Sequence, residues 1–332
     1  VTRLPQAHLF AGEQIVNKFW FRYRLFVLFA FVPLYAMAEP PFGGTAFVDP
    51  NIVVSTDPSV FGQVIDKGQG MRTVFDRRTN AFGAINAFLF EATGSDGSLI
   101  EAQINPEFGS VDAARVEAQR YARLIGQMPW ASRRNVRTFA VHRGDQDFGG
   151  NRNGSLLIHA GRTATYVDFG ALEEILIHEA GHASLDERHE NAPAWLAAQA
   201  ADGEFISTYA RDNPTREDVA ESYLMYLAVR DTSGRVSESL KTQVLSVIPH
   251  RIAYFDVERV LDWAERTYPQ IFGPAGQSTL SLTGYRYRSY ANGHFMAIQE
   301  ASPARLLYLG PLSNNTALDL GLLSNWVAKA AP

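Results

Sequence analysis

The stretch of sequence that most restricts the fold is LEEILIHEAGH, residues 172–182, which carries two histidines in an apolar setting. The pattern from 168 to 187 predicts a helix that surrounds these histidines with the apolar residues Leu172, Ile175, Leu176 and Ala183. A helix of this composition does not lie on a solvated surface, so other parts of the chain must cover it. Gly181, within the helix, allows neighbouring backbone to approach closely.

The two histidines have the spacing of a zinc site. Residues i and i+4 of a helix share one face, so His178 and His182 can direct their imidazoles at one ion, with Glu179 beside it. This is the HExxH pattern. The chain contains no cysteine, so zinc would have to be held by His, Asp or Glu. Two histidines do not complete a site, and a third ligand is needed.

Two nearby residues are candidates for the third ligand. Asp186 lies two turns beyond His178, a rise of about 12 Å, which is far for a short side chain to share one ion. His189 could reach the ion only if the helix ended and the chain folded back. Proteases that do this carry a glycine at the bend, where this chain has Leu185, and His189 also falls one position late.

A downstream pair of carboxylates is the better candidate. The segment 216–230 predicts a helix with Glu217 and Glu221 on one face, which also carries apolar residues. One carboxylate can bind the metal while the other accepts the free ring N–H of a ligating histidine. Two carboxylates on an apolar stripe need a cation, and zinc is the obvious one.

The segment FISTYARDNPTREDVAESYLMYL, residues 205–227, resembles the part that follows HExxH in zinc peptidases of the anthrax-lethal-factor and Pro-Pro-endopeptidase type. More broadly, residues 169–230 resemble the gluzincin, or thermolysin-like, class, with HExxH and a downstream ExxxE or ExxxD. The resemblance implies these roles: zinc ligands His178, His182 and Glu217, general base Glu179, and Glu221 as the partner of a ligand.

The same resemblance implies a tyrosine that precedes the ligand glutamate and steadies the oxyanion. Tyr209 matches this tyrosine, although it stands eight residues before Glu217, one residue further than in those peptidases. Tyr223 is the weaker alternative.

Periodicity predicts an α+β fold. Strands are expected at 81–92, 98–108, 135–144 and 154–161, and helices at 110–128, 168–187, 192–201, 216–230 and 237–248. A mixed sheet with the histidine helix, followed by a helical subdomain, is therefore expected over residues 39–255, and the resemblance makes this a zincin-like metallopeptidase domain.

A small accessory module is expected over residues 256–332. Its sequence predicts a helix at 257–272, a linker-like GPAGQS at 273–278 and three short strands after it. This part is similar to a small β-rich domain at the ends of many exported bacterial proteins.

Residues 1–38 predict an export signal. Lys18, Arg22 and Arg24 precede twelve mostly apolar residues, and Ala36-Met37-Ala38 offers a cleavage site. A secreted or periplasmic protein is expected, with a mature chain that begins near Glu39 and has no stable membrane insertion. An uncleaved anchor is the alternative, but a twelve-residue helix spans only about 18 Å of a bilayer core of about 30 Å. Residues 1–16 precede any signal-like feature and fit a misassigned start.

The predicted function is that of an exported zinc endopeptidase, in which Glu179 activates a zinc-bound water. A peptide or protein substrate would pair with a sheet edge at 154–161, unless that strand is internal. Two other functions stay open: a binding or surface protein that keeps a peptidase fold without turnover, and a metal-dependent hydrolase of a non-peptide bond. No Lys/Arg cluster of the nucleic-acid-binding kind is present and the formal charge is −5, so nucleic acid is not an expected partner. The sequence does not determine the oligomeric state.

Overall fold

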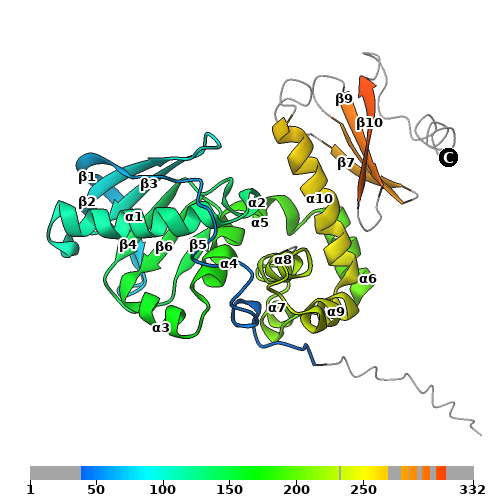
Figure 1. The fold of residues 1–332 in the computed structure, drawn as a ribbon, viewed down its shortest axis with the longest axis horizontal. Coiled ribbons are helices and arrows are strands. Elements are labelled where there is room, and N and C mark those ends of the chain that lie inside the picture. Colours follow the sequence, from blue (N-terminus) through cyan, green and yellow to red (C-terminus); the bar gives the residue numbers. More distant parts are fainter. Residues whose placement is uncertain are drawn as a thin grey trace, which may run out of the picture. The chain divides into compact units, whose positions relative to one another are not determined.

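The computed structural model describes residues 39–231, 233–267, 278–282, 284–289, 294–299 and 304–311. The part from Ala38 onward forms one compact unit (Figure 1). The expected export signal at 1–38 lies outside the described residues, as does most of the expected linker at 273–278.

The main sheet is mixed and has six strands. They are β1 (Ile65–Asp76), β2 (Ala81–Thr93), β3 (Leu99–Ile104), β4 (Thr138–His142), β5 (Gly149–Asn151) and β6 (Ser155–His159). Their order is β1-β2-β3-β4-β6-β5. The β3–β4 and β4–β6 pairs are parallel and the others are antiparallel. Parallel pairing of β3 with β4 requires a long crossover, which helix α1 provides.

Helices cover the sheet and form the second half of this part of the chain. They are α1 (Val111–Gln127), α2 (Trp130–Arg133), α3 (Thr163–Asp168), α4 (Leu172–Ser184), α5 (Asp186–His189), α6 (Pro193–Asp202), α7 (Thr208–Asp212), α8 (Asp218–Val229), α9 (Glu238–Val247) and α10 (Pro249–Thr267), with short 3-10 turns η1 (Thr45–Phe47), η2 (Pro106–Phe108) and η3 (Ala160–Arg162). The helix α4 lies between the sheet and α8 (Figure 1). One hydrophobic core joins both halves, from Phe139 of β4 to Trp195 of α6.

The α+β prediction is confirmed, and the predicted hairpin and the helices predicted at 110–128, 192–201, 216–230 and 237–248 are present within a few residues. The sequence pattern does not indicate β1 or β5. Most of β1 is exposed and lacks a clear apolar alternation, and β5 begins with two glycines. Both strands therefore depend on pairing with a neighbour. The histidine helix is shorter than expected, because Gly170, with φ of +61°, separates α3 from α4.

The expected sheet edge at 154–161 is wrong. The strand β6 pairs with β4 on one side and with β5 on the other, so it is internal. The edge on this side of the sheet is β5, which runs antiparallel to β6.

A second sheet of four antiparallel strands follows α10, in the order β10-β9-β8-β7. The strands are β7 (Ser278–Leu282), β8 (Tyr285–Ser289), β9 (His294–Gln299) and β10 (Arg305–Pro311). The first expected strand is thus two strands, separated at Gly284, whose φ is +78°. Met296 and Ile298 pack against Val257 and Leu261 of α10. Since α10 begins at Pro249, it spans the boundary expected at 255/256. None of the described helices combines the length and apolarity needed to cross a bilayer.

Two buried histidines lie at the end of β4 and β6, away from the histidine helix. The rings of His142 and His159 stack with centroids 5.3 Å apart. Neither ring nitrogen of His159 has a hydrogen-bond partner among the described residues. Burial, helped by His142, Arg78 and Arg77 and opposed by Asp76, lowers the pKa of His159 to about 4.

This pair predicts a loss of stability in mild acid. In the unfolded chain His159 takes up a proton below about pH 6.5, whereas the folded chain keeps it neutral to about pH 4. The unfolded state then binds more protons, so the free energy of unfolding falls over this window, by on the order of 3 kcal/mol. His159→Phe should flatten that fall, as measured by urea unfolding at pH 7.5, 6 and 4.5. An equal fall in both proteins would show that His159 does not titrate in this way.

Candidate metal centre

The helix α4 packs unusually closely against its neighbours β5 and α8. A Cβ added to Gly150 of β5 would lie 1.8 Å from the backbone oxygen of Glu179, so any side chain there would force strand and helix apart. On the other side, a Cβ added to Gly181 would lie 3.3 Å from the Cβ of Ala220 in α8. The close approach expected at Gly181 is confirmed. It places α4 directly against the start of α8.

Three donor atoms from these two segments form a small triangle. The Nε2 atoms of His178 and His182 are 3.2 Å apart. The Oε2 atom of Glu217, the residue just before α8, lies 3.3 Å from the first nitrogen and 3.1 Å from the second. The three residues are buried or nearly so, and this oxygen has no hydrogen-bond partner among the described residues. The group could hold a metal ion.

Glu221, one turn into α8, is held from several sides. Its Oε1 lies 3.1 Å from Nδ1 of His178. Its Oε2 accepts hydrogen bonds from the backbone N–H of Thr45, at 2.8 Å, and from the hydroxyl of Ser207, at 2.6 Å. The Thr45 hydroxyl also donates to the backbone carbonyl of Glu221, at 3.1 Å. The orientation of the His178 ring is therefore tied to two distant segments of the chain.

Asp186 contacts His182 much as Glu221 contacts His178. Its Oδ2 lies 2.8 Å from Nδ1 of His182, at the start of α5. Asp186 is thus not part of the donor triangle, as expected from its distance along the helix. The sequence does not indicate that Asp186 contacts His182. His189 is buried elsewhere, with its Nδ1 2.6 Å from the hydroxyl of Tyr254.

The electrostatics of the cluster favour positive charge at its centre. Burial lowers the pKa of both histidines, but the carboxylates outweigh it. Glu217 and Glu221 raise the pKa of His178 to about 10, and Asp186 and Glu217 raise that of His182 to about 9. Burial raises the pKa of Glu217, yet the two histidines hold it well below its usual range. Protons and metal ions therefore compete for the same nitrogens.

Of the other residues expected at the site, Glu179 and Tyr209 lie beside His178 and Tyr223 lies elsewhere. Glu179 is half-buried and follows His178 directly. The ring of Tyr209 in α7 stacks 6.2 Å from the His178 ring and is 44% exposed. Burial and the Glu217 carboxylate raise the pKa of the Tyr209 hydroxyl to about 12. Tyr223 is not at the site, because it packs against Tyr226 and Phe255 on another face of α8.

No known protein family, curated protein or solved structure matches this chain. The assignment of the centre therefore depends on the geometry of its own residues.

The sequence pattern does not indicate the roles that four residues have at the centre: Thr45, Gly150, Ser207 and Asp186, which it offers only as a candidate ligand. Thr45 lies in a Pro- and Gly-rich lead-in and Gly150 in an expected loop. Ser207 alone carries a local signal, since it is the N-cap of α7 and accepts a hydrogen bond from the backbone N–H of Ala210. The other three act through contacts between segments distant in sequence or between side chains.

Variants of the carboxylates should separate direct from indirect contributions to metal binding. Glu221→Ala and Asp186→Ala should each weaken zinc affinity by about 10–100-fold, because each releases one histidine ring. Glu217→Ala should weaken it further, because one of three donors is lost. Zinc competition with a chelating dye measures all three.

Glu187→Ala is the matched control, since Glu187 is an exposed acid next to Asp186. It should leave zinc affinity unchanged. Retention of full affinity in Glu217→Ala would remove that residue from the donor set.

Proposed function

We propose that this chain is a zinc-dependent endopeptidase of the zincin type. The observation that carries the proposal is the donor triangle of His178, His182 and Glu217 on a helix packed against a mixed sheet. Zinc–nitrogen and zinc–oxygen distances of about 2.0–2.1 Å in a tetrahedral site place neighbouring donors about 3.3 Å apart. The edges of the triangle, 3.1–3.3 Å, fit this requirement.

The outer contacts fit the same ion. A ligating imidazole normally gives its second ring N–H to a carboxylate, which fixes the tautomer. Nδ1 of each histidine here faces a carboxylate oxygen, of Glu221 or of Asp186. This leaves both Nε2 atoms as the metal-facing donors. When bound, zinc would supply Lewis-acid activation of water and of a carbonyl group.

Glu179 is the proposed general base. It follows His178 in α4 and is partly exposed. In the proposed reaction its carboxylate accepts a proton from the attacking water and then donates it to the leaving amine. Tyr209 remains protonated at neutral pH, because its pKa is about 12, so its hydroxyl can donate to the developing oxyanion.

The edge strand β5 supports a peptide as substrate. It is the outer strand of the sheet on this side, and its Gly150 lies against the backbone of Glu179. An extended peptide that added to β5 would pass next to the proposed general base. The edge strand in this proposal is therefore β5, which lies one strand further out than the edge expected at 154–161.

The arrangement also supports the family resemblance. A mixed sheet precedes the HExxH helix, and a helical part that contains Tyr209, Glu217 and Glu221 follows it. The proposal therefore includes a gluzincin-like catalytic domain of the lethal-factor and Pro-Pro-endopeptidase kind, an accessory β-rich module after it, and export through the segment 1–38.

Glu179→Gln tests the proposed chemistry. Hydrolysis of a peptide library or casein should fall by at least about 100-fold, because the base is lost while the zinc donors remain. Digests are followed by mass spectrometry, with zinc content measured on the same samples. Glu187→Gln, which neutralises an exposed acid outside the centre, should retain activity. If the zinc-loaded wild type cleaves no peptide bond, the endopeptidase proposal is wrong.

Tyr209→Phe tests the oxyanion donor. Removal of one such donor should lower kcat on the order of 100-fold with little change in KM, because the contact forms only in the transition state. Zinc content should stay unchanged. Tyr223→Phe, a buried tyrosine on another face of α8, is the control. A rise in KM with kcat unchanged would instead assign Tyr209 to substrate binding.

A further inference from the structure

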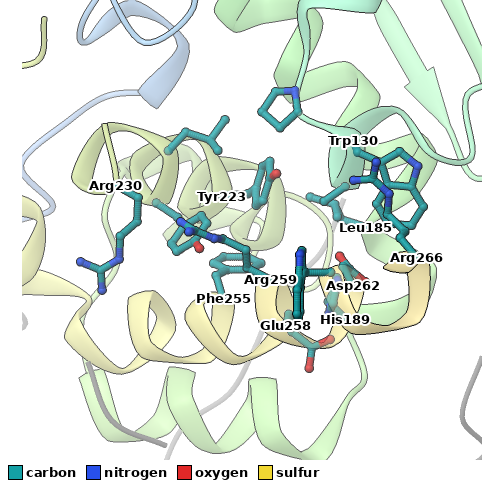
Figure 2. A pocket seen from close by; sticks show the side chains of 15 residues that line it. Trp130, Leu185, His189, Tyr223, Arg230, Phe255, Glu258, Arg259, Asp262 and Arg266 are labelled. Carbon is teal, nitrogen blue, oxygen red and sulfur yellow. The ribbon is translucent and has the colours of Figure 1, made fainter. Parts of the chain in front are cut away.

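A cavity of about 380 Å³ lies between α2, α5, α8 and α10 (Figure 2). We refer to it as the α8–α10 cavity. It is lined by residues from each of these helices, including Trp130, His189, Tyr226 and Arg259, and by none of the three metal donors. Its volume falls within the range of small-molecule binding sites.

The cavity and the metal centre use opposite sides of α8. Successive residues of a helix are rotated by about 100°, which puts Glu217 and Glu221 close together on one face. Tyr226 and Arg230, which line the cavity, lie more than about 130° away from them around the helix. A ligand in the cavity would therefore not touch the metal donors.

Five of the fifteen residues that line the cavity are aromatic. They come from three helices and are Trp130, Tyr223, Tyr226, Phe255 and Trp263. Tyr223, Tyr226 and Phe255 pack against one another with centroids 5.3–5.9 Å apart. Such a wall favours a flat or ring-containing ligand.

Two cations at the cavity have no acidic partner among the residues that the structure describes. Arg259 and Arg266 make no ion pair with any described residue, and both are exposed. The guanidinium of Arg266 lies 4.8 Å from the centroid of the Trp130 ring, and Figure 2 shows the two side chains together. Arg230, also at the cavity, is instead paired with Asp256.

The two acids at the cavity are already neutralised. Glu258 is paired with Arg188, at 3.0 Å, and with two arginines of β8. Asp262 is paired with Arg134, at 3.0 Å, and with Arg188, at 2.8 Å. These pairs leave Arg259 and Arg266 to set the charge that a ligand meets.

A buried polar atom also faces this region. The Tyr226 hydroxyl has no hydrogen-bond partner among the described residues, and the side chain is only 3% exposed. Burial and the Asp256 carboxylate raise the pKa of this hydroxyl, and the Arg259 and Arg230 cations oppose the rise. The hydroxyl therefore stays protonated beside a cation, as a donor for an anionic group.

We propose that the α8–α10 cavity binds a small organic anion with an aromatic ring, such as an aromatic carboxylate. The ring would pack among the aromatic side chains, and the anionic group would contact Arg259, Arg266 and the Tyr226 hydroxyl. A guanidinium is suited to this contact, because its N–H groups match the two oxygens of a carboxylate. The proposal does not depend on the metal centre or on peptidase activity.

The test uses 1-naphthoate as the probe on the full chain. Binding is followed by calorimetry and by tryptophan fluorescence, since Trp130 and Trp263 line the cavity. One site per chain is expected, and 1-naphthylmethylamine, a cation of similar size, should bind at least tenfold more weakly. The double variant R259Q/R266Q should weaken binding of 1-naphthoate by about tenfold or more. Y226F should weaken it by a few-fold.

Arg120→Gln is the matched control, because Arg120 is a partly exposed arginine on α1, outside the cavity. It should bind 1-naphthoate as the wild type does, as should the wild type treated with a chelator. Circular dichroism checks that each variant is folded. No saturable binding, equal binding of the cationic analogue, or unchanged affinity in R259Q/R266Q would each overturn the proposal.

Discussion

The position of α4 is the constraint on which the rest of the centre depends. The helix fits this close to β5 because Gly150 has no side chain, and Gly181 leaves a close contact with Ala220 of α8. This contact brings the two imidazoles of α4 to within 3.3 Å of the Glu217 carboxylate. A side chain at Gly150 would push the strand away from Glu179, and one at Gly181 would press on Ala220. The change at Gly150 would open the triangle without touching a donor atom.

Buried charge makes this arrangement costly unless every group has a partner. Near both ends of α8, paired networks supply such partners. At its start, Asp218 accepts hydrogen bonds from Arg251, at 2.9 Å, and from Gln199, at 2.9 Å, which fixes the turn that carries Glu217. Beyond its end, Arg230 pairs with Asp256 of α10. The helix is thus anchored on either side of the residues that face the metal centre.

The segment before β1 is part of the centre rather than a lead-in. Thr45 donates to Glu221, and the backbone of residues 42 and 43 accepts hydrogen bonds from Thr208 and Tyr209. Arg211 of α7 also pairs with Glu39, the residue expected to begin the mature chain. The segment therefore supports both the His178 partner and the helix that bears the proposed oxyanion donor.

The sequence by itself determined the local features: the helix with histidines one turn apart, the carboxylate pair at 217 and 221, and the α+β order of elements. These follow from periodicities of 3.6 and 2 residues and from cap and turn residues, all of which act within a few positions. Only the tertiary structure decided that β5 is the sheet edge, that Asp186 contacts His182 and that Thr45 contacts Glu221. Some of these contacts join segments that no local sequence pattern links. The others depend on the direction of a side chain at the end of a helix. They are fixed by close packing of α4, which no single segment specifies alone.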